Sequence, residues 1–241
     1  MTLKPFLAPA DWSRVHRTLR KLATNNIAHF ALTGGLAIET HLLLAHRPPL
    51  ERDFNDLDFI VPAFADIPRT LTNGFLFRHV HPDDLPGKNL LQCIDPETKL
   101  RIDLFRAYGS EMKRLIGVEI AGVSIRMVSL GDMAARHARL SWDLTDGKAV
   151  PSKFARDFLR MSEVISCDEV QHIWPEHRKA QMPATFADAV ARLRAAIQSR
   201  PDLLVAPGYS TDVHKVCDRC KEVADFPLAR GGQILSILGY C

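Results

Sequence analysis

Residues 31–61 read ALTGGLAIETHLLLAHRPPLERDFNDLDFIV, and this stretch decides the fold. The apolar run Ile27–Thr33 predicts a short buried strand that stops at Gly34-Gly35. Leu36–His46 then has the length and composition of a helix. A glycine turn at such a junction exposes backbone N–H groups of the helix N-terminus, where a phosphate can approach closely. The same junction also occurs as a simple tight connection, so the glycines alone decide no function.

Two aspartates open the next predicted strand, Asp56–Val61, in which polar and apolar residues alternate at first. Side chains two residues apart on a strand point the same way, with Cα atoms roughly 6.5–7 Å apart. The carboxylates of Asp56 and Asp58 can therefore share a pair of hard cations about 3.5–4 Å apart, the spacing used for phosphoryl displacement. Magnesium favours a few carboxylates plus substrate phosphates. The alternative is an ordinary solvated strand face.

A third aspartate, Asp103, lies on a later predicted strand, Leu100–Arg106, between two apolar residues. A carboxylate in this position is costly near a core unless it is paired or binds a metal. A salt bridge to Arg101 or Arg106 is the alternative. The combination of a glycine turn, paired aspartates and a later strand aspartate favours a metal site.

Composition sets wide limits on function. The chain has 241 residues, of which 46% are hydrophobic and 24% charged, enough for a globular core. A net charge of +3 tolerates a phosphate-bearing ligand without indicating nucleic-acid binding. No apolar run resembles a signal-peptide core or is long enough to span a bilayer, which favours a soluble cytoplasmic protein. The five scattered cysteines do not resemble a disulfide framework.

Sequence patterns change near Ser129, from mixed strands and helices to helices alone. Further elements are predicted at Asp11–Asn25 (helix), Phe75–Val80, Leu90–Ile94, Val118–Ile120 and Val123–Val128 (strands), and Leu130–Leu144, Pro151–Ile165, Asp168–His177 and Thr185–Gln198 (helices). The prediction is an α+β fold with a mixed sheet followed by a helical C-terminal region. Its proposed parts are a catalytic core in residues 1–128, a helical region in 129–200 and an irregular tail in 201–241.

The order of strand, double glycine, helix, Asp-x-Asp strand and later strand aspartate resembles the polymerase-β-like nucleotidyltransferase superfamily. The resemblance covers roughly residues 27–128 and the helical half more loosely. Within this superfamily the chain looks closest to bacterial stand-alone members. These include the abortive-infection nucleotidyltransferase toxins of toxin–antitoxin systems and antibiotic-modifying enzymes.

The resemblance implies roles for individual residues. Gly34 and Gly35, with Thr33 before them, would cradle a nucleoside triphosphate. Both metal ions would be held by the first two aspartates of the signature, Asp56 and Asp58. The third, Asp103, would bind the catalytic metal and help the acceptor hydroxyl lose its proton.

Similar proteins often carry a basic residue before the Asp-x-Asp and pack a basic helix against the catalytic half. Arg52, Lys153 and Arg156 are therefore further candidates for triphosphate binding. The alternatives are a surface-loop arginine and an ordinary ion pair between Lys153 and Asp157, four residues apart on a helix.

A basic stripe, Arg136, His137 and Arg139, is interpreted as a solvated helix face, although contact with phosphate or RNA is the alternative. Cys217 and Cys220 have zinc-ligand spacing, and His214 and Cys241 would complete a tetrahedral set. A single C-x2-C is weak, so free thiols are favoured over zinc. No protease or hydrolase motif occurs in the sequence.

The predicted activity is transfer of a nucleoside monophosphate from a nucleoside triphosphate such as ATP, with two Mg²⁺ ions, to an acceptor hydroxyl. A tRNA end, a protein side chain and a small molecule such as an antibiotic are all compatible acceptors. A different hypothesis is a non-catalytic binding protein or antitoxin-like regulator that keeps the fold. A third is a zinc-dependent nucleic-acid-binding module in the tail.

Overall fold

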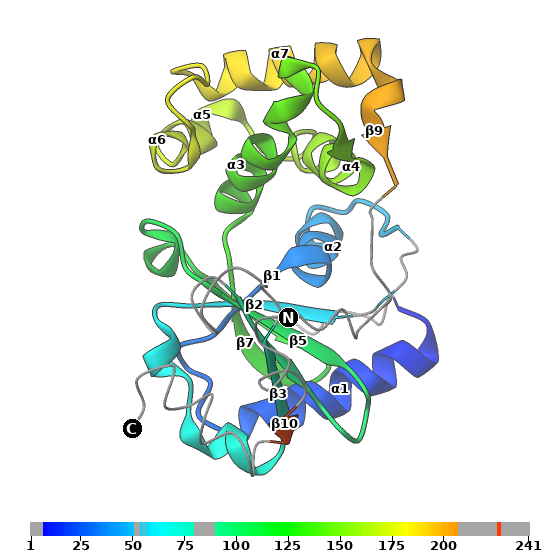
Figure 1. Cartoon of the computed structure of the whole chain (residues 1–241), viewed down its shortest axis with the longest axis vertical. Coiled ribbons are helices and arrows are strands. Elements are labelled where there is room, and N and C mark those ends of the chain that lie inside the picture. Colours follow the sequence, from blue (N-terminus) through cyan, green and yellow to red (C-terminus); the bar gives the residue numbers. More distant parts are fainter. Residues whose placement is uncertain (1–6, 51–53, 55, 80–89, 207–225, 228–241) are drawn as a thin grey trace.

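The computed structural model describes residues 7–50, 54, 56–79, 90–206 and 226–227. Its centre is a mixed sheet with the strand order β10-β3-β4-β5-β2-β1-β7-β6, and a second small sheet pairs β8 with β9 (Figure 1). The strands are β1 Ala31–Thr33, β2 Asp56–Val61, β3 Leu76–His79, β4 Leu90–Ile94, β5 Arg101–Arg106, β6 Ile116–Ile120, β7 Val123–Met127, β8 Val150–Pro151, β9 Leu204–Val205 and β10 Phe226–Pro227.

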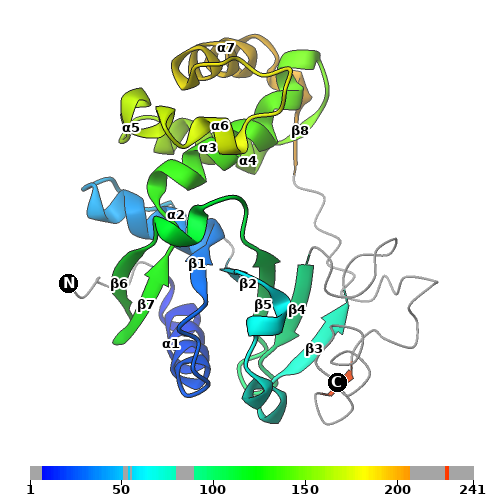
Figure 2. The same cartoon turned by 90° about the vertical axis from the view of Figure 1, so that its left-hand side faces the viewer.

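Helices cover the sheet and then form a bundle beyond it (Figure 2). The α-helices are α1 Pro9–Ala23, α2 Gly34–Leu44, α3 Leu130–Ser141, α4 Ser152–Met161, α5 Cys167–Gln171, α6 Trp174–His177 and α7 Phe186–Ser199. Short 3₁₀ helices occupy Phe64–Asp66, Arg69–Asn73, Glu111–Lys113, Trp142–Asp146 and Pro201–Leu203. The predicted α+β class, a mixed sheet followed by a helical region, is confirmed.

The middle of the sheet sets up the site. β2 is antiparallel to β1 and parallel to β5. Leu57 and Phe59 of β2 are completely buried, while Asp56 and Asp58, which alternate with them, point to the other face and are partly exposed. Helix α2 follows β1, packs on β1 and β2, and lies between the sheet and helices α3 and α4 (Figure 1).

Most predicted elements are present, and three need correction. The predicted helix Pro151–Ile165 is shorter, because Pro151 pairs with Val205 as part of β8 and α4 ends at Met161. The predicted helix Asp168–His177 is instead α5 and α6, because the ring of Pro175 would clash with the carbonyl four residues earlier in a continuous helix. The predicted strand Ile27–Thr33 begins only at Ala31, because the Phe30 N–H donates to the Ile27 carbonyl in a turn. The two strands predicted at Val118–Ile120 and Val123–Val128 are present as β6 and β7, which pair as a hairpin with positive φ at both turn residues.

Within the described ranges, no helix has the length and apolar character that a membrane crossing requires. Several predicted site residues lie outside these ranges: Arg52, His214, Cys217, Cys220 and Cys241.

Candidate functional site

The glycine turn joins β1 to α2 and lies directly against Asp58. Gly34 has φ +66°, and a Cβ atom added there would overlap the Asp58 carboxylate. The backbone N–H of Gly35 donates a hydrogen bond to the same side chain. Glycine is thus required both by the left-handed backbone conformation and by the close approach of the carboxylate.

Three carboxylates meet beside this turn, and we call Asp56, Asp58 and Asp103 the acidic cluster. Parallel pairing of β2 with β5 places Asp58 directly opposite Asp103. One oxygen from each residue lies within 4.8 Å of the others. Asp103 is buried, while the other two side chains are partly exposed. The structure therefore brings together the three carboxylates that the sequence singled out.

Neighbouring side chains form ion pairs and hydrogen bonds with two of the three carboxylates of the acidic cluster. Arg101 lies two residues before Asp103 on β5 and therefore on the same face of the strand. It forms an ion pair with Asp56, and its Nε lies 3.2 Å from Asp103 Oδ1. Gln92 Nε2 donates to Asp103 Oδ1 at 2.7 Å. The salt bridge to Arg101 that the sequence offered as an alternative is thus present together with the clustered carboxylates.

The charge of Asp58 is poorly compensated in the absence of a cation. Burial and then repulsion by Asp103 raise the pKa of Asp58 to about 7. The positive charges of Lys153 and Arg136 and the hydrogen bond from Gly35 oppose this rise in pKa. Burial and the neighbouring Asp103 thus disfavour the charged form of Asp58, and a cation bound at the cluster would favour it.

Helix α4 supplies a further positive charge that acts on the acidic cluster, that of Lys153. The Lys153 charge acts on Asp58, and its Nζ lies 5.1 Å from the ring centroid of Phe154. Arg156 is exposed, and its Nε lies 3.7 Å from Asp157 Oδ1. Of the two predicted α4 candidates, Lys153 is thus the one with an electrostatic contact to the cluster.

The basic stripe on α3 differs from the prediction. Arg136 Nη1 donates to Thr33 Oγ1 at 3.1 Å, directly before the glycine turn. His137 is buried, and its Nδ1 lies 2.8 Å from the Met133 carbonyl oxygen. The solvated-face interpretation is wrong for these two residues, because packing of α3 against the rest of the chain covers them. Arg139 lies over the ring of Tyr108 at 5.0 Å.

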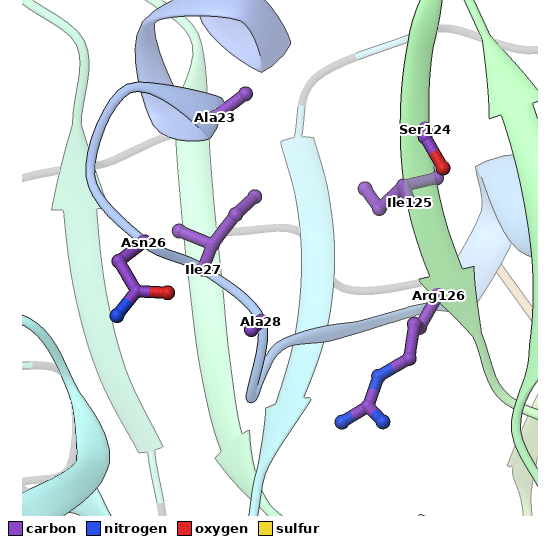
Figure 3. Close-up of a pocket in the computed structure, with 7 residues that line it drawn as sticks. All are labelled: Ala23, Asn26, Ile27, Ala28, Ser124, Ile125 and Arg126. Carbon is purple, nitrogen blue, oxygen red and sulfur yellow. The ribbon is translucent and has the colours of Figure 1, made fainter.

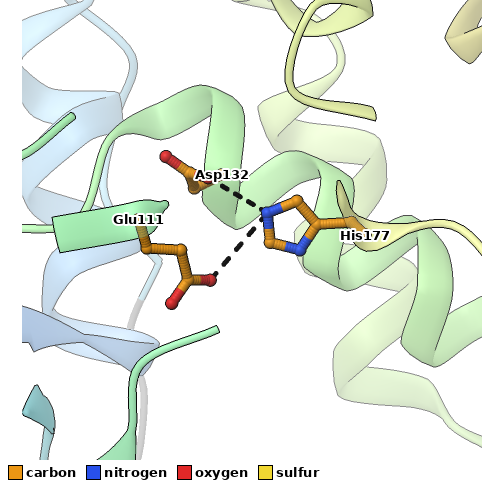
Figure 4. A group of neighbouring side chains, drawn as sticks. All are labelled: Glu111, Asp132 and His177. Carbon is orange, nitrogen blue, oxygen red and sulfur yellow. Dashed lines mark hydrogen bonds and ion pairs between the residues drawn. The ribbon is translucent and has the colours of Figure 1, made fainter. Parts of the chain in front are cut away.

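A second group of ligand-type side chains was missed by sequence reasoning. Glu111, Asp132 and His177 are buried, with ligand atoms within 4.8 Å of one another, and Figure 4 shows His177 between the two carboxylates. With Arg114 and Arg136, which pair with them, these three residues form what we call the polar network. They come from separate segments, so only the helix-capping pattern Ser129-x-x-Asp132 was visible in the sequence.

Arg114 and Ser129 fill the hydrogen-bonding capacity of Asp132 in the polar network. Arg114 donates to both Asp132 oxygens at 2.7 and 3.0 Å, and to both Glu176 oxygens at 2.9 Å. Hydrogen bonds from His177, Arg114 and Ser129 outweigh burial and hold the pKa of Asp132 well below its usual range. The pKa of Glu176 is lowered to about 2, mainly by Arg114.

A hollow of about 230 Å³ lies elsewhere, lined by Ala23, Asn26, Ile27, Ala28, Ser124, Ile125 and Arg126 (Figure 3). Its first four lining residues precede β1, whereas the glycine turn follows β1. The hollow therefore lies at the other end of the strand from the acidic cluster, and no predicted site residue within the described ranges lines it.

No protein-family model and no curated protein matches this chain. Among solved structures, it is similar to a Megavirus polyadenylate synthase, with 14% identity and a TM-score of 0.46 over 64% of this chain. The chain spans 32% of the length of that synthase. It is also similar to an antigenic nucleotidyltransferase-like protein from Paracoccidioides brasiliensis, with 17% identity, a TM-score of 0.44, and coverage of 83% of this chain and 93% of the other.

Proposed function

We propose that this chain is a magnesium-dependent nucleotidyltransferase that transfers a nucleoside monophosphate from a nucleoside triphosphate to an acceptor hydroxyl. The observation that carries this proposal is the acidic cluster beside the Gly34-Gly35 turn. In the proposed organisation this chemistry belongs to residues 1–128. Residues 129–200 contribute the basic side chains of α3 and α4, and residues 201–241 follow, with β9 paired to β8 and β10 paired to β3.

The donor set of the acidic cluster fits magnesium. Carboxylate oxygens are the hard ligands that this ion prefers, and three of them lie within 4.8 Å of one another. Burial and then repulsion by Asp103 raise the pKa of Asp58, and a divalent cation would relieve the repulsion between these carboxylates. Asp56 and Asp58 would hold two ions, and Asp103 would join them at the catalytic one. Bound magnesium supplies charge neutralisation for the triphosphate and for the pyrophosphate that leaves.

The side chains around the cluster position the reactants. Arg136 and Lys153 place positive charge on the triphosphate side, next to the turn that begins after Thr33. In the reaction, the acceptor oxygen bonds to the α-phosphorus, the bond from that phosphorus to the bridging oxygen breaks, and pyrophosphate leaves. Asp103 is the group proposed to take the proton of the acceptor hydroxyl.

One contact favours a second candidate function, a non-catalytic nucleotide-binding or antitoxin-like regulatory protein of the same fold. Arg101 pairs with both Asp56 and Asp103, where a catalytic metal would need those oxygens. A chain in which this guanidinium stays in place would bind a nucleotide without transferring it.

Labelling separates the two candidates. The full chain is incubated with Mg²⁺, a cell lysate and each nucleoside triphosphate labelled at the α-phosphate, and the labelled product is identified as tRNA, protein or small molecule. Transfer that Asp58→Asn removes supports the enzyme. Nucleotide binding without any transfer supports the regulatory protein, and absence of nucleotide binding rejects both.

Lys153→Ala tests the helical contribution. Nucleotide binding should weaken, while the melting temperature stays within the scatter of surface substitutions, because Lys153 lies on a helix face near the cluster. Arg156→Ala is the matched variant on the same helix, and it tests the other α4 candidate. Unchanged nucleotide affinity in Lys153→Ala removes this residue from the proposed site.

A further inference from the structure

The Glu111 carboxylate is completely buried and has a defined partner for each oxygen. Oε2 accepts a hydrogen bond from the backbone N–H of Tyr108 at 3.0 Å. Oε1 forms an ion pair with Arg136 Nη2 and lies 3.9 Å from His177 Nε2 (Figure 4). Because both oxygens are fixed, the Glu111 side chain is a rigid anchor within the polar network.

Arg136 connects this anchor to the candidate site. Its Nη2 pairs with Glu111, and its Nη1 donates to Thr33 Oγ1 at 3.1 Å. Thr33 precedes Gly34 and is the register partner of Asp58 on β2. A guanidinium is a planar, rigid fork, so two fixed nitrogens determine the direction of the whole group. The Arg136 charge also acts on Asp58, which places this cation beside the acidic cluster.

A metal ion is a poor occupant for the polar network. Arg114 donates to both oxygens of Asp132, and Arg136 occupies Glu111. Arg114 is shared between Asp132 and Glu176, and Arg136 pairs with Glu111, so these carboxylate oxygens are already occupied and an added cation would be repelled by both guanidinium groups. The ion pair between Glu111 and Arg136 instead suits a role in which Glu111 fixes the position of the Arg136 side chain.

We propose that Glu111 is a positioning residue that holds Arg136 against Thr33, so that the guanidinium is already directed at the polyphosphate group of a nucleotide. This inference rests on the proposed function, because it assigns the ligand of Arg136 to the triphosphate. A free arginine side chain loses much conformational freedom when it binds a ligand. Holding it beforehand removes that cost from the binding step.

Calorimetric titration of the full chain with Mg-ATP tests the proposal. Glu111→Gln keeps the size of the side chain and removes its charge, and the dissociation constant should rise about five- to tenfold through loss of a buried charged pair. Glu176→Gln is the matched control, since Glu176 pairs with Arg114 and not with Arg136. It should leave the ATP affinity unchanged. Melting temperatures of all variants are measured in parallel.

A double-mutant cycle separates positioning from general stability. Arg136→Ala should weaken ATP binding, and adding Glu111→Gln to it should have no further effect. An equal loss in both backgrounds would overturn the positioning role. Wild-type affinity in Glu111→Gln would do the same while leaving the proposed function intact. If the wild-type chain binds no Mg-ATP, the proposed function itself fails and this inference fails with it.

Arg136→Lys provides a test that does not depend on a substitution at a fully buried position. Lysine keeps the charge but, as a single ammonium group, does not reproduce the two-nitrogen fork between Glu111 and Thr33. ATP affinity should fall nearly as far as in Arg136→Ala. Wild-type affinity in Arg136→Lys would overturn the proposal.

Discussion

The acidic cluster and the polar network each bring carboxylate groups close together, yet the pKa shifts of their aspartates have opposite directions. The first raises the pKa of Asp58 to about 7, whereas the second holds the pKa of Asp132 well below its usual range. Arg114 and Arg136 are built into the polar network, while the acidic cluster has Arg101 alongside three carboxylates. Proximity of ligand atoms is therefore a weaker sign of a cation site than charge left uncompensated.

The largest expected difference concerns activity. Asp58→Asn should reduce nucleotidyl transfer on the order of a thousandfold, because a group that stabilises the transition state by electrostatics is removed. Transfer of label from the α-phosphate measures the effect. Asp146→Asn, at an exposed position distant in sequence, is the control and should retain activity. Full activity in Asp58→Asn would refute the assignment of the acidic cluster.

The two clusters should differ next in stability. Asp132→Asn should lower the free energy of unfolding by about 3 kcal/mol, because it leaves Arg114 without its buried bidentate partner. Asp58→Asn should leave stability unchanged or raise it, since it removes a repelled charge. Urea unfolding without metal at neutral pH measures both. Similar losses in the two variants would mean that the acidic cluster is structural.

The unfolding free energy should also respond to pH with opposite signs. The Asp58 pKa rises from 3.8 to about 7 on folding, so its contribution to stability is fully present below about 3.8 and is lost as the pH rises through 7. The Glu176 pKa falls from 4.5 to about 2, so its contribution is present above 4.5 and is lost as the pH falls towards 2. This rise in the Asp58 pKa corresponds to about 4 kcal/mol at most, and partial exposure of the Asp58 side chain to solvent reduces the expected change to about 1–2 kcal/mol.

Urea unfolding of the metal-free chain at a series of pH values tests these signs. Asp58→Asn should flatten the curve between about pH 4 and pH 7.5, and Glu176→Gln should flatten it below about pH 4.5. Magnesium should flatten the first region in the wild-type chain as well. An unchanged curve in Asp58→Asn would contradict the raised pKa.

The smallest expected effect concerns the guanidinium beside the acidic cluster. Arg101→Gln should bind Mn²⁺ about fivefold more tightly, equivalent to roughly 1 kcal/mol, because a cation that competes for Asp56 and Asp103 is removed. Titration followed by electron paramagnetic resonance measures the affinity. Arg106→Gln, exposed on the same strand, is the control. Weaker Mn²⁺ binding in Arg101→Gln would instead mean that this arginine supports the metal site.

Much of the candidate site was predictable because it depends on local pattern. The aspartates of β2 share one face as the alternation of Asp56–Val61 predicts, and the double glycine marks the β1–α2 junction. Even the break between α5 and α6 was visible in principle, since Pro175 cannot continue a helix. The roles of Arg52 and Arg156, the cysteine pair and the division of the chain into three parts stay predictions.

The sequence by itself determined the α+β class, the glycine turn and the identity of the three carboxylates, because strand alternation and glycine conformation are properties of short segments. Only the tertiary structure decided that Asp103 lies opposite Asp58, since the register between distant strands depends on how the whole sheet packs. The tertiary structure also decided that Arg136 donates a hydrogen bond to Thr33 and forms an ion pair with Glu111. Such contacts join segments far apart in the chain, and their charges balance only after folding buries them together.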